Sequence, residues 1–303
     1  MINAENLSKV FSRDGTIAVD SVSFTINDGE ILGFAGLNGA GKTTTIRMMA
    51  GVSFPTSGKV LVDGYDVVNE KVKASRTTGW VPEIPNFEAN VKPLQLLTYY
   101  GGFFGMERDE VRKRGGELLE EFGLGTYVNK RLKTYSQGMK KRMMMVSCLL
   151  SNPQNLLFDE TLNGLDPEGV YFMRNKILDL KKQGKAVLLS SHILSELESV
   201  ADRVLIIHHG KIVGDVTRED LRSFRKASAL KIIVENPDDR LKDILERYGD
   251  VTMDGKYVEV RNVSAELSEI NKLLLKENYS VSSFGSEGSN LENYFFEKLG
   301  VKK

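Results

Sequence analysis

The stretch Gly36-Leu37-Asn38-Gly39-Ala40-Gly41-Lys42-Thr43-Thr44 decides the fold of this chain. It fits the pattern G-x-x-x-x-G-K-S/T of a phosphate-binding loop, or P-loop. Residues 30–35 before it form a short apolar run that predicts a buried strand, and residues 44–50 after it favour a helix that Gly51 is expected to end. Strand, glycine-rich loop and helix in this order are the context that the pattern requires. The sequence therefore predicts a site for a nucleoside triphosphate.

The residue types in this loop suit the binding of phosphates. Glycines such as Gly39 and Gly41 let the backbone approach closely and turn its N–H groups toward the ligand. The N-terminus of the following helix adds a partial positive charge. Lys42 is long enough to reach the β- and γ-phosphates, and the Thr43 hydroxyl is a ligand for Mg²⁺. The alternative, a plain glycine turn before an ordinary helix, does not explain the Lys-Thr pair.

The composition limits the classes to which the chain can belong. Its 303 residues allow one or two domains. Lys and Arg number 41, as do Asp and Glu, and this balance gives no indication of nucleic-acid binding. Cys148 is the only cysteine, which excludes a disulfide and a cysteine metal cluster and is consistent with a reducing compartment. We expect no signal peptide, and no apolar run approaches the roughly 18 residues of a membrane span, so action at a membrane would need another chain.

The chain changes character along its length in a way that predicts two domains. Residues 1–90 carry strand and turn signals and residues 91–151 carry helical ones, which indicates a helical insertion in a sheet domain. From residue 155 strands alternate with helices, as in a mostly parallel sheet. We expect an α/β P-loop domain over residues 1–225, with its helical subdomain at about 91–151, followed by a linker.

Residues 229–303 are expected to form a second, smaller α+β domain. Their pattern is strand, helix, strand, strand, helix, strand, which is the order of a split-βαβ, ferredoxin-like unit. A last helix follows, for which Ser289 and Glu292 form a capping box. No nucleotide motif occurs in this part. We interpret it as an accessory or dimerising module.

Residues 156–160, Leu-Leu-Phe-Asp-Glu, predict an apolar strand that ends in two acids. Such a strand puts its carboxylates at the carboxyl edge of the sheet, where the ligand sites of α/β proteins lie. Asp159 would hold Mg²⁺, and Glu160 would orient or deprotonate an attacking water. Acid pairs at strand ends are common, and this one gains its meaning from the phosphate-binding loop in the same chain.

A second phosphate-binding helix end is predicted at Tyr135-Ser136-Gln137-Gly138-Met139. Ser136 is well placed as the N-cap of the helix that follows, and a helix N-terminus with a hydroxyl and a glycine suits an anion. The alternative is a plain cap. Lys140, Lys141 and Arg142 in the first turn oppose the helix dipole, a cost that an anionic partner would offset.

Together these motifs resemble the nucleotide-binding subunit of ATP-binding cassette (ABC) transporters, over residues 1–225. By this resemblance residues 36–44 correspond to the Walker A loop, and residues 156–160 to the Walker B strand with its catalytic glutamate. Residues 135–139 correspond to the family's signature loop, and 163–166 to its D-loop. Ser190-Ser191-His192 resembles the switch segment, in which His192 would contact the γ-phosphate.

The resemblance implies a set of site residues for ATP and Mg²⁺. Glu160 and His192 would be catalytic, and Mg²⁺ would be held by Thr43, Glu83 and Asp159. The residues that would contact ATP bound to the same chain are Phe11, stacked on adenine, and Gly36, Leu37, Asn38, Gly39, Ala40, Gly41, Lys42, Thr43 and Thr44. Those that would contact ATP bound to a partner are Ser136, Gln137, Gly138 and Asp166.

Two positions depart from the family pattern. Glu83 stands where the family usually has glutamine, although a carboxylate is also a good ligand for a hard cation. Thr161 follows the catalytic glutamate where proline is common, and its presence is expected to loosen the entry to the D-loop without abolishing the chemistry.

The resemblance implies an ATPase that powers transport, with export favoured, through a separate membrane permease. It implies a homodimer or a pairing with a second nucleotide-binding subunit, on the cytoplasmic face of the membrane, and no role for nucleic acid. The alternative is a soluble ABC ATPase that is not coupled to transport. A P-loop kinase is a weaker rival, because it leaves the signature loop and His192 unexplained.

Overall fold

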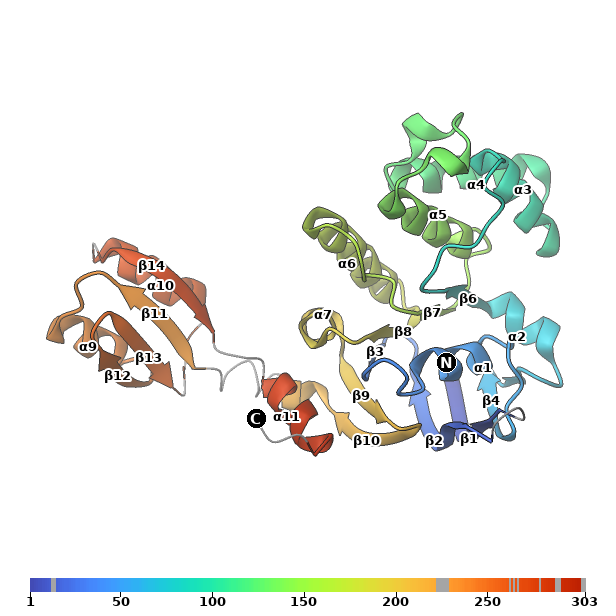
Figure 1. Ribbon diagram of the computed structural model, residues 1–303. Helices are drawn as coiled ribbons and strands as arrows, with labels where there is room; N and C mark the ends of the chain where they lie inside the picture. The colour runs from blue at the N-terminus through green and yellow to red at the C-terminus, as the bar shows by residue number, and fades with distance from the viewer. Residues whose placement is uncertain are drawn as a thin grey trace. The chain divides into compact units, whose positions relative to one another are not determined.

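The computed structural model describes residues 1–11, 15–221, 229–261, 263, 265, 267–277, 279–286 and 290–300 (Figure 1). The chain forms two compact units, Met1–Asp215 and Val216–Lys303. This division lies about ten residues before the boundary that we expected near residue 225, at the end of strand β10 (Lys211–Val216). The expected capping residue Ser289 lies outside the described residues.

A six-stranded sheet forms the centre of the first unit, in the order β10-β9-β3-β8-β7-β6. Its other strands are β3 (Ile31–Ala35), β6 (Thr78–Val81), β7 (Asn155–Phe158), β8 (Ala186–Ser191) and β9 (Arg203–His208). β3 pairs in parallel with β8 and β9, and β7 with β6 and β8, so the prediction of a mostly parallel sheet is confirmed. Parallel pairing brings the carboxyl ends of β3, β7 and β8 to one edge, and Gly36, Asp159 and His192 follow these ends directly.

A second sheet in this unit is antiparallel, in the order β2-β1-β4-β5. Its strands are β1 (Ile2–Val10), β2 (Ile17–Ile26), β4 (Ser57–Val62) and β5 (Tyr65–Asp66). β4 and β5 form the hairpin predicted from Asp63-Gly64, and both turn residues have positive φ, 49° and 84°. Two positive φ values are typical of a type I′ turn, whose twist matches that of the paired strands.

Helix α1 (Lys42–Met49) connects the two sheets through one apolar core. Ile46, Met48 and Met49 are fully buried in a cluster that includes Leu7 of β1 and Phe34 of β3. The helix starts two residues earlier than expected, directly after Gly41. The packing of α1 between two sheets fixes the direction of its N-terminus, which follows the phosphate-binding loop.

The helical insertion predicted at about 91–151 is present and stands apart from the strands in Figure 1. It contains α3 (Pro93–Phe103), α4 (Arg108–Glu121) and α5 (Gln137–Leu149), with short 3-10 turns η1 (Gly125–Tyr127) and η2 (Leu132–Thr134). The sequence predicts these three helices at residues 93–104, 109–122 and 137–150, and the observed ends agree with these bounds to within one residue. Helix α2 (Lys71–Thr77), in a part for which we predicted strands and turns, is a helix that the sequence reasoning missed.

Two further helices complete the first unit. They are α6 (Pro167–Lys182) and α7 (Leu194–Val200). The pair Asp166-Pro167 predicts a helix start and Gly184 its stop. Asp166 is the N-cap of α6 and Pro167 its first residue, and Gly184 just beyond the end has φ of 81°. Proline at the first position and glycine past the last are the usual helix start and stop.

The second unit contains one antiparallel sheet in the order β12-β13-β11-β14. Its elements are β11 (Leu230–Val234), α9 (Asp239–Leu245), β12 (Asp250–Asp254), β13 (Tyr257–Arg261), α10 (Leu267–Lys276), β14 (Val281–Ser286) and α11 (Asn290–Lys298). Apolar side chains from the sheet, such as Ile232 and Val258, form one core with Leu241 of α9 and Ile270 of α10.

In the part of the chain that the structure describes, no helix combines the length and the apolar character that crossing a bilayer requires.

Candidate active site

The loop between β3 and α1 has the backbone shape that binds phosphates. Gly39 and Gly41 have φ of 80° and 115°, in the left-handed region that favours glycine. A Cβ on Gly41 would lie 2.5 Å from the carbonyl oxygen of Ala18, and a Cβ on Gly36 would lie 2.6 Å from that of Ile207. Gly41 is therefore needed for space as well as for φ, Gly39 for its φ, and Gly36 for space. The first turn of α1 receives no side-chain cap, so its N–H groups remain available to an anion.

Lys42 is held inside this loop, with 5% of its surface exposed. Its Nζ donates to the carbonyl oxygen of Gly36 at 2.7 Å and to that of Leu37 at 3.3 Å. The same Nζ lies 3.1 Å from Oε1 of Glu160, which is equally buried. A buried ion pair offsets the cost of taking both charges out of water. Phosphate oxygens that enter the loop would compete with Glu160 for this ammonium.

Asp159 lies beside Thr43 at the sheet edge and is 1% exposed. Its Oδ1 accepts hydrogen bonds from the hydroxyls of Thr43, at 3.2 Å, and of Ser190, at 2.9 Å. Its Oδ2 is buried and has no hydrogen-bond partner among the described residues. Burial raises the pKa of this carboxyl, and the bonds from Ser190 and Thr43 act in the opposite direction. An orphaned carboxylate oxygen next to a hydroxyl is a fitting start for a hard-cation site.

Glu160 is held by contacts on its backbone and on its side chain. Its φ of 49° is unusual for a residue other than glycine. Its N–H donates to Oγ of Ser190 at 3.0 Å, and its Oε2 lies 2.9 Å from Nδ1 of His192. His192 itself is partly open to solvent. These contacts direct the carboxylate toward Lys42 and His192, and backbone strain of this kind often occurs at functional sites.

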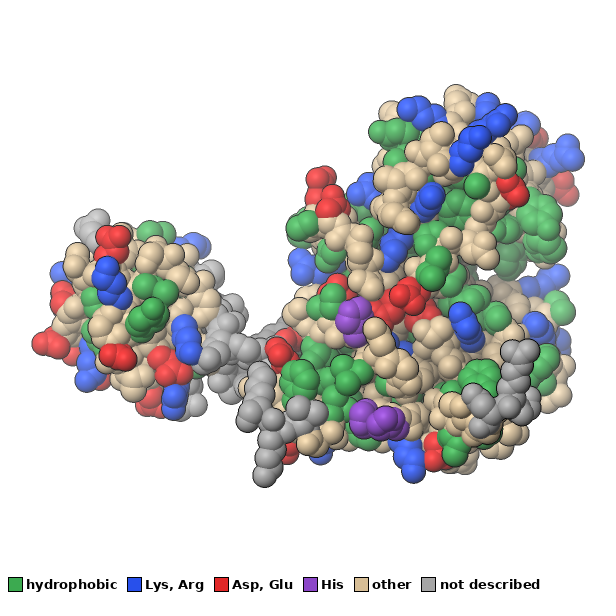
Figure 2. All heavy atoms as spheres, in the orientation of Figure 1, with side chains coloured by type: hydrophobic (Ala, Val, Ile, Leu, Met, Phe, Trp, Pro, Cys, Tyr) green, Lys and Arg blue, Asp and Glu red, His purple; other side chains and the backbone are tan. Residues whose placement is uncertain are grey.

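An open cavity of about 360 Å³ lies over these residues. Its lining consists of Ala18, Leu37, Asn38, Gly39, Gly41, Lys42, Thr43, Thr44, Glu83 and Glu160. The cavity therefore brings Glu83 to the phosphate-binding loop and Glu160, although these residues are far apart in the sequence. Figure 2 shows acidic side chains gathered beside a histidine in a hollow of the larger unit.

The residues predicted to contact a partner's ATP do not line this cavity. Ser136 is exposed and caps α5, because its Oγ accepts from the N–H of Met139 at 3.2 Å. Asp166 is exposed and caps α6 by accepting from the N–H of Gly169 at 2.9 Å. Gln137 is exposed, and Gly138 has room for a Cβ, with Leu165 the nearest contact at 3.7 Å.

The expectation for the three cations near the start of α5 needs a correction, because the helix begins at Gln137 and two of them lie in its second turn. We expected Lys140, Lys141 and Arg142 to await an anionic partner. The Nζ of Lys141 points instead to backbone carbonyls after β7, and the guanidinium of Arg142 lies 4.5 Å from the ring centre of Phe172. Two of the three cations therefore have partners within the chain, and the argument from the helix dipole was wrong for them.

Phe11 is not among the residues that line the cavity. Its ring is 44% exposed, and the ammonium of Lys9 lies 5.5 Å from the ring centre. Phe11 is thus partly exposed on the surface of the first unit. Its predicted stacking on adenine remains a prediction.

Two residues help to form the site although the sequence analysis did not name them as site residues: Ser190 was only part of the switch segment, and Ala18 was not mentioned. Ser190 bonds to the side chain of Asp159 and to the backbone of Glu160, and its position at the end of β8 beside β7 was the available signal. Ala18 lines the cavity because the turn at Gly210 joins two distant segments. Gly210 donates to the carbonyl of Ala40 at 2.9 Å and accepts from the N–H of Asp20 at 2.8 Å. No local pattern indicates this contact.

The fold and the site define a P-loop nucleoside triphosphatase, and comparison with known proteins identifies the family. The family model described as ABC transporter matches residues 19–163. The uncharacterized ABC transporter ATP-binding protein YhcH of Bacillus subtilis (strain 168) is 34% identical over 95% of this chain and 93% of its own length. The bacitracin transport ATP-binding protein BcrA of Bacillus licheniformis is 32% identical over 99% of this chain and 97% of its own.

A solved structure of an ATP-binding subunit of an ABC transporter has a similar fold. It is 29% identical, with a TM-score of 0.67, and the match covers 74% of this chain and 92% of that one. The chain therefore belongs to the ATP-binding proteins of ABC transporters. It binds ATP and hydrolyses it to power transport.

Proposed function

We propose that this chain powers the export of an antibiotic through a separate membrane permease, from the cytoplasmic face of the membrane. The observation that carries the proposal is the similarity to the bacitracin transport protein, which extends over 99% of this chain and so includes the second unit. A similarity limited to the first unit would support only that both proteins hydrolyse ATP. Because the similarity includes the second unit, it also supports that this chain serves the same type of transporter as the bacitracin transport protein.

The geometry supports a division of roles in hydrolysis. Lys42 would bind the β- and γ-phosphates after leaving Glu160. Glu160 would take a proton from the attacking water, whose oxygen bonds to the γ-phosphorus as the bond to ADP breaks. His192, 2.9 Å from Glu160 Oε2, would hold that carboxylate in place and contact the γ-phosphate. Preorganised charges of this kind supply most of the catalysis in phosphoryl transfer.

Mg²⁺ fits the residues at the sheet edge. Asp159 has a buried oxygen without a partner, Thr43 offers a hydroxyl beside it, and Glu83 lines the same cavity. Among the described residues no three His, Cys, Asp or Glu side chains converge as a metal cage. This matches a cation that keeps several waters and is shared with a substrate's phosphates. When bound, Mg²⁺ would neutralise charge that develops on the phosphate oxygens.

We further propose that two copies close around ATP, each covering the nucleotide of the other. The exposed N-terminus of α5, with Ser136, Gln137 and Gly138, lies outside the chain's own phosphate cavity. An exposed helix end with a serine cap is suited to the γ-phosphate of a second copy. Asp166 at the exposed start of α6 would contact the same nucleotide, and Phe11 would stack on the adenine of its own chain.

The permease is proposed to dock on an aromatic groove beside the helical insertion. A groove of about 250 Å³ is lined by Trp80, Tyr100, Phe103 and Phe104, among others, and Phe103 is 68% exposed. Phe104 also lines a neighbouring pocket of about 220 Å³.

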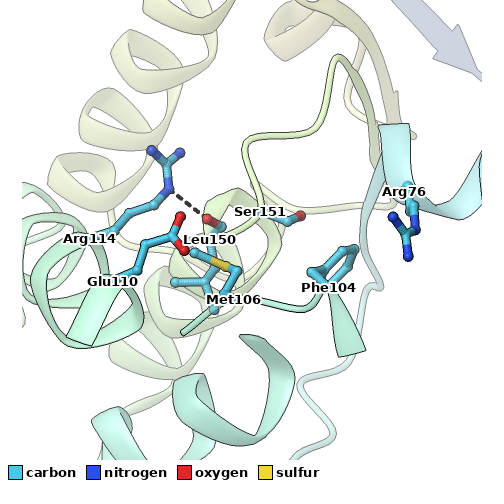
Figure 3. A pocket seen from close by; sticks show the side chains of 7 residues that line it. All are labelled: Arg76, Phe104, Met106, Glu110, Arg114, Leu150 and Ser151. Carbon is cyan, nitrogen blue, oxygen red and sulfur yellow. Dashed lines mark hydrogen bonds between the residues drawn. The ribbon is translucent and has the colours of Figure 1, made fainter. Parts of the chain in front are cut away.

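The neighbouring pocket carries charged groups at both ends, with Arg76 at one end and Arg114 and Glu110 at the other (Figure 3). Arg114 is fixed there, because its Nε donates to the carbonyl oxygen of Leu150 at 2.6 Å. Aromatic walls with charges at the rim fit an amphipathic segment of the permease that carries polar side chains.

The second unit is proposed to be ferredoxin-like and to steady the dimer. Its antiparallel order β12-β13-β11-β14 and its βαββαβ sequence of elements support that fold. If ATP-driven dimerisation is unchanged after deletion of residues 229–303, the role in the dimer is wrong.

The export role is tested in cells that contain the permease. Replacing the chain by its Glu160→Gln variant is expected to lower resistance to bacitracin several-fold, because transport loses its energy source. Glu246→Gln, on the exposed end of α9, is the matched control and should leave resistance unchanged. Full resistance in the Glu160→Gln strain would contradict export of this class of compound.

The paired arrangement is tested by the mass of the purified Glu160→Gln variant with and without ATP and Mg²⁺. We expect a monomer without nucleotide and a dimer with it. A second change, Ser136→Arg, should abolish the dimer, because the larger side chain would fill the helix end. A dimer that persists in the double variant would show that Ser136 is not in the interface.

A further inference from the structure

Lys141 joins the helix of the signature loop to the turn that carries Glu160. It lies in the second turn of α5 and is 8% exposed. Its Nζ donates to the carbonyl oxygen of Glu160 at 3.2 Å and to that of Thr161 at 3.3 Å. A third, shorter contact goes to the carbonyl oxygen of Asn163. The Lys141 ammonium thus donates to three carbonyl oxygens within residues 160–163.

The charge of this lysine is compensated by its surroundings. Burial lowers the pKa of the Lys141 ammonium, and the carboxylates of Glu83, Glu160 and Glu196 act in the opposite direction. Three carbonyl oxygens match the three N–H donors of an ammonium group. A buried charge with a full set of acceptors is costly to replace by an apolar group in the same place, because the carbonyls would then be left without a donor.

The turn that Lys141 holds is the one whose geometry matters for hydrolysis. Glu160 has a positive φ. Within residues 160–163, which the structure describes, one backbone hydrogen bond is formed, from the N–H of Asn163 to the carbonyl of Glu160 at 3.2 Å. Thr161 follows Glu160, and a threonine does not restrict the backbone by itself as a proline would. We expected Thr161 to loosen this segment. The side chain of Lys141 instead restrains the same backbone through its hydrogen bonds.

We propose that Lys141 is a positioning residue for ATP hydrolysis, which fixes the backbone of residues 160–163 and links it to the helix that begins at Ser136. The inference rests on the proposed role of Glu160 as the base. Through this link, a phosphate bound at the N-terminus of α5 is connected to the base in the other site of the pair. Lys141 touches no substrate and acts only through the turn.

The prediction follows from the position of the contacts. Without Lys141 the Glu160 carboxylate would lose part of its orientation, and displacements of about 1 Å can cost a factor of about 100 in rate. ATP binding would change little, because Lys42, Thr43 and the glycine loop do not contact Lys141. The signature of the proposed role is thus a lower kcat with an almost unchanged KM.

The experiment compares Lys141→Met with a matched control in the full-length chain. Lys185 is equally buried, and its Nζ donates to the carbonyl of Asn152 at 3.3 Å and to the side-chain oxygen of that residue at 2.8 Å. Lys185→Met therefore removes a similar buried cation that does not touch the turn. The measurements are kcat and KM for ATP, the affinity for ADP, and the thermal midpoint of each variant.

For Lys141→Met we expect kcat to fall roughly tenfold to a hundredfold, with KM and ADP affinity within about twofold of wild type. Lys185→Met should lower the thermal midpoint by a similar amount and leave kcat nearly unchanged. Lys141→Arg, which keeps the charge and its donors, should retain more turnover than Lys141→Met. If Lys141→Met does not fold, Lys141→Arg and Lys141→Gln provide the same comparison of a charged with an uncharged donor.

Two results would overturn the inference. One is a kcat of Lys141→Met, or of Lys141→Gln in its place, close to that of wild type. The other is an equal loss of kcat in Lys185→Met at the same loss of thermal midpoint, which would make the effect of Lys141 merely structural. A different result would refute the proposed base instead: Glu160→Gln retaining full turnover while Lys141→Met loses it.

Discussion

The two units of this protein have apolar cores, but only the first also buries a set of polar and charged side chains among the described residues. The core of the second unit, among its described residues, is built from apolar side chains such as Leu241 and Ile270. The first unit buries polar and charged side chains as well. They are Lys42, Thr45, Lys141, Asn155, Asp159, Glu160, Thr161, Lys185, Ser190 and Ser191. Seven of these ten make up the site or directly adjoin it, and Thr45, Asn155 and Lys185 are the exceptions.

This difference shows that the first unit keeps buried charges at its candidate site although they reduce the stability of the fold. A buried charge costs free energy unless it is paired, and apolar groups of equal volume are often the more stable choice. The first unit nevertheless keeps Lys42 against Glu160 and leaves one oxygen of Asp159 without a partner. The second unit has no such cluster among its described residues.

The largest effect is expected from Glu160→Gln, which keeps the shape of the site and removes its proposed base. Turnover should fall by about a factor of 10³, within the range for loss of a general base. Phosphate release by the purified chain measures this directly. The fold should survive, because the amide can still bond to Lys42 or His192. Unchanged turnover would show that another group takes the proton.

A smaller effect, on stability, is expected from Lys42→Met. The variant leaves the Glu160 carboxylate buried without its cation, which we expect to cost about 3 kcal/mol in free energy of unfolding. His192 remains beside that carboxylate and limits the loss. In the double variant Lys42→Met/Glu160→Gln most of the loss should be recovered, because no charge is stranded. Chemical denaturation without nucleotide measures the free energy of unfolding of wild type, both single variants and the double variant. If the losses in the two single variants add up in the double variant, Lys42 and Glu160 are not coupled.

The second unit should respond to a conservative core change without any effect on hydrolysis. Ile270→Val is expected to cost about 1 kcal/mol in that unit and to leave turnover unchanged. Ile46→Val in α1, where the side chain is also fully buried, is the matched change in the first unit. Hydrogen exchange followed for each unit separately distinguishes the two. Loss of turnover in Ile270→Val would show that the units are coupled.

The smallest effect is a pH dependence caused by Asp159. Burial raises the pKa of this carboxyl in the folded chain above its ordinary value of 3.8. The folded state therefore favours protonated Asp159. This contribution to stability is fully present below pH 3.8 and is lost as the pH rises through the raised pKa of the folded state. Asp159→Asn does not titrate, so its stability relative to wild type should increase from about pH 4 to neutral pH. Urea midpoints without Mg²⁺ and nucleotide test this, and a pH-independent difference would contradict it.

Much of the secondary structure and of the site followed from local patterns. The strand Asn155–Phe158 followed from its apolar residues 156–158, which lie between the polar residues Asn155 and Asp159. Asp166-Pro167 marked the start of α6 for a similarly local reason. Helix α2 was missed, since its sequence Lys-Val-Lys-Ala-Ser-Arg-Thr buries only Ala74 and so has no apolar stripe. Because the apolar residues of α2 do not recur at helical spacing, packing against neighbouring elements decides that this segment is a helix.

The sequence by itself determined the phosphate-binding loop, the acids after β7 and the capped helix at Ser136. Each of these depends on residues close together in the chain, whose spacing sets their geometry. Only the tertiary structure decided that Ser190 holds Asp159, that Ala18 reaches the cavity, and that Lys141 turns inward. Those contacts depend on strand order and helix packing, which join residues that are 19 to 31 positions apart or more. A local pattern cannot specify a partner that the fold brings from another element.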